Sequence, residues 1–122
     1  FCQYRLYFTW SEKFKAISFT ITFDLKFPRL KLKEAHELLA LINENLWIGH
    51  FDITSRNGIP AYRYTLMSIE ESGKLFNQLE DLVDNAIYEC EKYYPAFQLV
   101  LFEDSKPSNA LNFSEFDTIG QA

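Results

Sequence analysis

One stretch constrains the fold of this chain more than any other: residues 16–27, which read AISFTITFDLKF. Apolar side chains occupy every second position from Ile17 to Phe27, and Ser, Thr, Asp and Lys fill the positions between them. Because successive side chains of a strand point to opposite faces, the pattern predicts an antiparallel strand with one buried face and one wet face. Pro28 ends it, since proline has no N–H for a ladder.

Three further segments are predicted to be strands. Residues 2–10 alternate in the same way, with Cys2, Tyr4, Leu6, Phe8 and Trp10 on one face. Residues 47–54 and 61–69 also read as strands, and the Asn57-Gly58 turn signal between them indicates a hairpin.

Two segments between the strands have helical periodicity. In residues 30–46 and 74–94, apolar side chains recur three and four positions apart. Pro95 should kink or end the second helix, and we expect a kinked continuation to about residue 103. A last short helix is expected from Lys106-Pro107, with residues 117–122 as a tail.

The predicted order is therefore β-β-α-β-β-α-α. This order indicates an α+β fold, an antiparallel sheet with helices packed on one face. The 122 residues suffice for a single domain spanning 1–122, without an internal repeat or a linker.

The charge distribution disfavours one large class of function. The formal net charge is −5, whereas nucleic-acid-binding domains are usually basic. Residues 1–35 hold seven Lys/Arg and three Asp/Glu, a net charge of +4, and residues 36–122 hold five and fourteen, a net charge of −9. Such asymmetry can orient a partner or pair two copies of the chain, or it can simply solvate different faces.

A local basic cluster lies where the strand of residues 16–27 leads into the first helix. Aromatic residues beside it would suit single-stranded nucleic acid. Ion pairing with the acidic second helix is favoured instead, because of the net charge. The cluster comprises Lys26, Arg29, Lys31 and Lys33.

Motifs for cofactor or metal chemistry are missing from the sequence. It contains no P-loop, GxSxG, HExxH, CxxC or GxGxxG, so we expect no cofactor, no metal site and no enzyme activity. No segment has the roughly 18 consecutive apolar residues of a membrane span. Cys90 is expected in the core, its pairing with Cys2 stays open, and a reducing cytoplasmic setting is the simpler interpretation.

The two histidines are the side chains that titrate nearest neutral pH. His36 is expected as a packed residue at the flank of the first helix. His50 and Asp52 share one face of a strand, which would let a carboxylate orient an imidazole. Arg63 and Thr65 are expected across the hairpin on the same face, so a solvated charge cluster explains the group without catalysis.

Aromatic residues make up 17% of the chain, and its tyrosines are too many for the core alone. Tyrosine tolerates one wet end and therefore suits interfaces; a dimer seam, a peptide groove and scattered half-exposed side chains all remain open. The residues that we predict to bind a partner are Tyr7, Trp47, His50, Asp52, Arg63 and Tyr94.

Four stretches resemble the YbjN family, which carries the label of bacterial sensory transduction regulators: TFDLKFP (22–28), ELLALINENLWIGHFDI (37–53), CEKYYPAF (90–97) and DTIGQA (117–122). The resemblance implies a fold like that of type III secretion chaperones and native residues before Phe1, with a helix and a strand among them. It implies no enzymatic activity, and the label names no mechanism.

These observations predict a non-enzymatic module that binds a protein partner, chaperone-like in fold and able to form a homodimer. The alternative is a small-ligand sensor or an enzyme centred on His50, Asp52 and Arg63. A regulator that binds nucleic acid ranks third.

Overall fold

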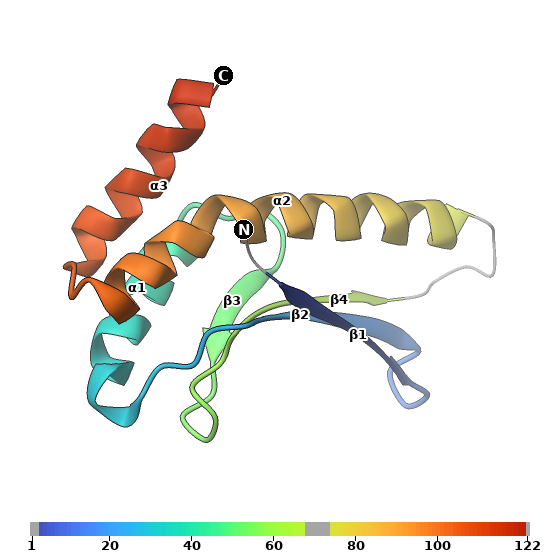
Figure 1. The fold of residues 1–122 in the computed structure, drawn as a ribbon. Coiled ribbons are helices and arrows are strands. Elements are labelled where there is room, and N and C mark those ends of the chain that lie inside the picture. Colours follow the sequence, from blue (N-terminus) through green and yellow to red (C-terminus); the bar gives the residue numbers. More distant parts are fainter. Residues whose placement is uncertain (1–2, 68–73, 122) are drawn as a thin grey trace.

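The computed structural model describes residues 3–67 and 74–121 (Figure 1). The predicted order of strands and helices is confirmed. The elements are β1 (Tyr4–Ser11), β2 (Ala16–Phe23), a 3-10 turn η1 (Arg29–Lys31), α1 (Leu32–Asn43), β3 (His50–Ile53), β4 (Pro60–Met67), α2 (Lys74–Phe102) and α3 (Pro107–Gln121).

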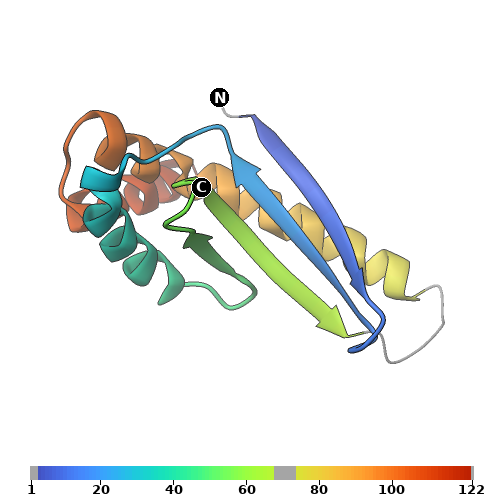
Figure 2. The same ribbon diagram turned by 90° about the horizontal axis from the view of Figure 1, so that it is seen from below.

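The four strands form one antiparallel sheet in the order β1-β2-β4-β3. Figure 2 shows β1 at one edge and the short β3 at the other. Tyr4 pairs with Phe23 and Trp10 with Ile17, so the apolar sides of β1 and β2 share one face. This is the face predicted from the alternation, and the helices lie over it (Figure 1).

The core lies between the sheet and the C-terminal half of α2, with α1 and α3 packed around that end (Figures 1 and 2). Aromatic rings from both layers meet there. The Phe97 ring of α2 lies 5.3 Å from the Phe23 ring and 5.8 Å from the Phe51 ring, and all three residues are buried. Ring contacts of this kind add to the burial of apolar area.

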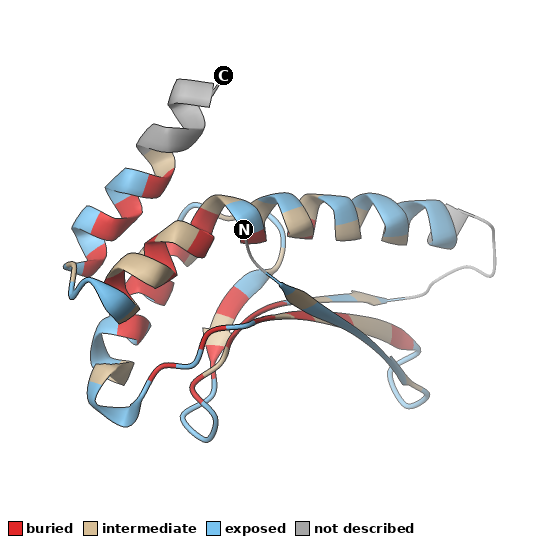
Figure 3. Cartoon of the chain, viewed as in Figure 1, coloured by how far each residue is buried: buried red, intermediate tan, exposed pale blue. Residues whose placement is uncertain are grey.

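Coverage of the helix-facing side is uneven (Figure 3). On β2, Phe19 and Ile21 are 1% exposed. Their partners on β1, Phe8 and Leu6, are 50% and 41% exposed. The edge strand therefore presents apolar side chains that the described helices cover only in part.

Pro95 lies inside α2, which continues to Phe102 as expected. A proline in a helix leaves the carbonyl four residues earlier without its N–H donor. That residue is Glu91, which is exposed, so water can hydrate its carbonyl. The axis of α2 changes direction in its C-terminal half, toward α3 (Figure 1). The helix ends where Asp104 takes a φ of 53° and Ser105 N–H donates to the Leu99 carbonyl over 3.1 Å.

Several predicted boundaries are wrong. β2 stops at Phe23, although Leu25 and Phe27 continue the alternation and are buried. β3 begins only at His50, because Gly49 has a φ of 70° and breaks the extended backbone.

Two other expectations also fail. Residues expected as a tail belong to α3, which runs to Gln121. His36 is exposed rather than packed, since α1 turns Ala35, Leu38 and Ile42 toward the core and His36 to the side.

Candidate functional site on the open face of the sheet

The face of the sheet that the helices leave open carries polar side chains in two rows across the strands. The first row runs from Arg5 on β1 through Thr22 and Ala61 to Asp52 on β3. The second runs through Tyr7, Thr20, Arg63 and His50. Residues opposite one another on adjacent strands lie within contact distance, so these rows bring distant parts of the sequence together.

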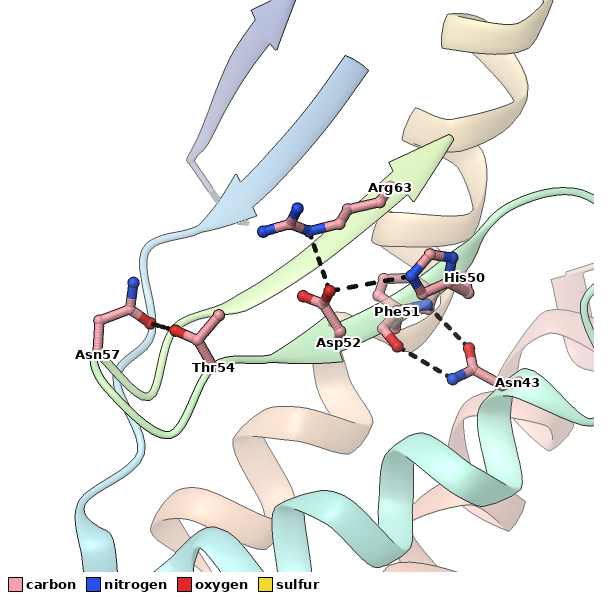
Figure 4. Close-up of polar contacts among 7 residues, drawn as sticks. All are labelled: Asn43, His50, Phe51, Asp52, Thr54, Asn57 and Arg63. Carbon is pink, nitrogen blue, oxygen red and sulfur yellow. Dashed lines mark hydrogen bonds and ion pairs between the residues drawn. The ribbon is translucent and has the colours of Figure 1, made fainter. Parts of the chain in front are cut away.

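An ion pair anchors the β3–β4 end of these rows (Figure 4). Arg63 Nε lies 2.9 Å from Asp52 Oδ2. His50 Nε2 lies 3.9 Å from the same oxygen, which is too far for a hydrogen bond. The predicted cluster is confirmed, but the carboxylate holds the guanidinium and not the imidazole. The arrangement thus lacks the hydrogen bond by which a carboxylate orients a histidine base.

Asn43, the last residue of α1, fixes β3 beneath this cluster (Figure 4). Its side chain accepts a hydrogen bond from Phe51 N–H at 2.8 Å and donates one to the Phe51 carbonyl at 3.0 Å. His50 and Asp52 flank Phe51 and are positioned by this clamp. Our sequence reasoning missed Asn43; the only signal was an asparagine, a poor helix former, at the end of an apolar stripe.

Two hollows flank the ion pair. The larger hollow has a volume of about 630 Å³ and is lined by residues of both rows, from Arg5 and Tyr7 on β1 to Asp52 on β3. We call it the open-face cup. The smaller, about 610 Å³, lies beside His50 and Thr65. Asp52 and Arg63 line both hollows, so this pair separates them.

The predicted partner-binding residues divide into three groups. Tyr7, His50, Asp52 and Arg63 share the open face. Trp47 is 99% exposed and lies in the loop between α1 and β3. Tyr94 is only 5% exposed, and its hydroxyl donates to Asp24 Oδ1 at 2.8 Å. A buried Tyr94 cannot contact a partner directly, so we leave it out of the binding surface.

The other tyrosines also divide between core and surface. Tyr62 and Tyr93 are buried, and burial raises the pKa of each to about 12. The hydroxyl of Tyr62 donates to the Ile48 carbonyl at 2.6 Å, which ties β4 to the loop before β3. Tyr88 is about half exposed, as is Tyr7.

The basic cluster is partly ion-paired, as the sequence favoured. Lys31 Nζ forms an ion pair with Asp104, two residues beyond the end of α2, and donates to the Val100 carbonyl of α2 at 3.2 Å. Lys26 instead lines the open-face cup.

Cys90 is buried in the core, as predicted. Cys2 lies outside the described residues, so its pairing is untested. Within residues 3–67 and 74–121, no three His, Cys, Asp or Glu side chains gather as a metal site would require. Nor does this part of the chain contain a helix both long and apolar enough to cross a membrane.

The described residues form an α+β fold whose sheet has an apolar face that the helices cover in part and an open polar face. A family model, "YbjN: Putative bacterial sensory transduction regulator", matches residues 1–99. The chain belongs to the YbjN family. The match includes all four strands and Asn43 and ends before α3. No curated protein and no solved structure matches the chain, so the likeness to type III secretion chaperones stays a prediction.

Proposed function

We propose that the chain is a non-enzymatic regulatory module that binds a protein partner along β1. One observation carries the proposal. Leu6, Phe8 and Trp10, three consecutive helix-facing residues of the edge strand, are 41%, 50% and 49% exposed. Contiguous exposed apolar side chains of this kind mark interaction surfaces. The regulator label of the family agrees with a binding role and names no reaction.

The edge of β1 offers more than apolar area. On an edge strand, every second residue turns its backbone N–H and C=O away from the sheet, where another strand can pair with them. An added strand would place alternate side chains beside the row of Leu6, Phe8 and Trp10. Backbone hydrogen bonds then supply affinity, and the apolar row supplies specificity.

The charges of this region define the partner. Residues 4–11 carry one charged side chain, Arg5, and no carboxylate. Residues 1–35 have a net charge of +4. The complementary partner is an extended polypeptide segment of another protein, apolar at alternate positions and acidic between them.

The test uses capture of protein partners by the tagged protein from lysate of its own source. A captured protein supports the proposal only if the Phe8→Ser/Trp10→Ser variant loses it and hydrogen exchange shows protection of residues 4–11 in the complex. The Phe113→Ser control, at a half-exposed apolar position on α3, should keep it. Equal capture by all three proteins would overturn the proposal, as would no capture at low salt.

Two other occupants of the edge are distinguished in the same experiments. A concentration-dependent dimer that Phe8→Ser abolishes would identify a second copy as the occupant. A second comparison uses a longer chain that carries the upstream residues implied by the resemblance. If this chain fails to bind a partner that residues 1–122 capture, those upstream residues are the occupant of the β1 edge. Either result would overturn the proposal of a separate partner.

The enzyme alternative at His50, Asp52 and Arg63 has weaker support, because Asp52 accepts from Arg63 and not from His50. The His50→Ala variant tests this alternative. If His50 is catalytic, the variant should remain as stable as the unmodified protein and lose activity, whereas a structural role predicts lost stability. The ligand-binding part of this alternative has independent support from the open-face cup.

A further inference from the structure

The open-face cup has the dimensions of a small-molecule site. Its volume of about 630 Å³ falls within the range of roughly 300–1,000 Å³ typical of ligand pockets. Small side chains form its floor, because Thr20, Thr22 and Ala61 lie side by side on β2 and β4. Longer side chains from β1 and β4, Tyr7 and Arg63 among them, stand around this floor.

One wall of the cup is held in place by hydrogen bonds. In the β3–β4 loop, Thr54 Oγ1 lies 2.7 Å from Asn57 Oδ1, and Gly58 N–H donates to the Thr54 carbonyl at 2.8 Å. The Gly58 carbonyl accepts from Phe27 N–H at 2.8 Å, which ties the loop to the segment after β2. A Cβ at Gly58, whose φ is 70°, would lie 2.2 Å from the Phe27 carbonyl oxygen. The wall is therefore preformed.

The charges lining the cup do not balance. Three cations line it, against two carboxylates. Asp52 pairs with Arg63, and Asp24 accepts a hydrogen bond from the Tyr94 hydroxyl.

The remaining two cations, Arg5 and Lys26, make no ion pair with any residue that the structure describes. The lining of this hollow therefore carries a net charge of +1, although the chain as a whole has a net charge of −5. An anionic ligand would compensate this local excess.

We propose that the open-face cup binds a small organic anion through a carboxylate or phosphate group held by Arg5 and Lys26. A guanidinium presents paired donors that match either group, and an ammonium adds a second charge. The remainder of the ligand packs on the ring of Tyr7, over the threonine floor. Arg63 uses Nε for Asp52, and its terminal nitrogens extend away from that carboxylate (Figure 4). No residue of 3–67 or 74–121 forms an ion pair with these terminal nitrogens, so they can donate to the same ligand.

This site shares Arg5 with the proposed protein-binding surface, but it does not include the apolar row on which that proposal rests. Arg5 and Tyr7 point to the open face, whereas Leu6 and Phe8 point to the helix-facing side of the same strand. A failure of one proposal leaves the other standing.

Titration calorimetry on the full-length protein tests the site with three probes: inorganic phosphate, citrate and AMP. We expect saturable binding of citrate or AMP with a dissociation constant below about 1 mM at low salt. Arg5→Gln and Lys26→Gln should each weaken binding at least tenfold. Lys33→Gln removes the same charge from an exposed position on α1 outside the cup and should change binding less than twofold.

The probes also separate the sources of the anion. Binding of both phosphate and AMP identifies a phosphate ligand, and binding of citrate alone identifies a carboxylate ligand. A tenfold loss of AMP binding in Tyr7→Ala would confirm the packing of the organic part. The proposal is overturned if no probe shows saturable binding at 5 mM, or if Lys33→Gln weakens binding as much as Arg5→Gln, because the effect would then be one of net charge alone.

Discussion

Two ends of the same sheet face differ sharply in this molecule. At one end, Phe23 and Phe51 lie under the C-terminal half of α2 and are 4% and 1% exposed. At the other end, Phe8 and Trp10 are about half exposed. In the N-terminal half of α2, Leu82 and its neighbours are only partly buried.

The same alternation of apolar and polar residues produced both ends. The difference teaches that alternation decides which side of a strand is apolar, while the position of the covering helices decides how much apolar area leaves the water. We therefore assign stability to the covered end and binding to the exposed end. The following predictions can break or sharpen this division.

The largest effect is expected at the covered end. Phe97 is buried and contacts the rings of Phe23, Phe27 and Phe51. Phe97→Ala should lower the free energy of unfolding by about 3–5 kcal/mol, because the cavity cannot fully collapse. Urea unfolding measures the change. Phe102→Ala, at an exposed position on the same helix, should cost far less, and equal losses would contradict the division.

Alkaline pH should also destabilise the covered end. Burial raises the pKa of Tyr62 and Tyr93 to about 12, above the unfolded value of about 10. Their contribution is complete below pH 10 and is lost as the pH rises toward 12. At pH 11 the loss should be about 2–3 kcal/mol for the two groups together. Urea midpoints between pH 9 and 11 measure it, and an equally steep decline in the Tyr62→Phe/Tyr93→Phe variant would refute the assignment.

A smaller loss is expected where Asn43 clamps β3. Asn43→Ala leaves the N–H and carbonyl of buried Phe51 without their side-chain partner and should cost about 1–3 kcal/mol. Asn43→Asp keeps the acceptor for Phe51 N–H but turns a carboxylate oxygen toward the Phe51 carbonyl, so it should not restore the lost stability. Urea unfolding compares them with Asn112→Ala, an exposed helical position; no difference from that control would mean that the clamp is dispensable.

The smallest effect on stability is expected at the exposed end. Phe8→Ser removes a side chain that is already half in water, so the loss should stay below about 1 kcal/mol. The same substitution should abolish partner capture. Urea unfolding and capture assays on the same protein make the contrast direct, and a loss as large as that of Phe97→Ala would place Phe8 in the core.

Much of the open-face site was predictable from the sequence. His50 and Asp52 share a face by the period of a strand, and the hairpin places Arg63 beside them. The sequence could not show that Asp52 would prefer Arg63 to His50, because that choice depends on side-chain distances of 2.9 and 3.9 Å. Tyr94 was misplaced for a related reason: a tyrosine on an apolar helix stripe looks the same whether its hydroxyl meets water or Asp24.

The sequence by itself determined the order of the elements and the two faces of each strand, whereas it left open whether Pro95 kinks or ends α2. The order and the faces depend on local periodicity, which is a property of neighbouring residues. Only the tertiary structure decided the strand order β1-β2-β4-β3, which places Arg5 and Tyr7 in line with Asp52 and His50. It also decided which end of the apolar face the helices cover. Strand order and coverage depend on contacts between residues far apart in the chain, and no local pattern encodes them.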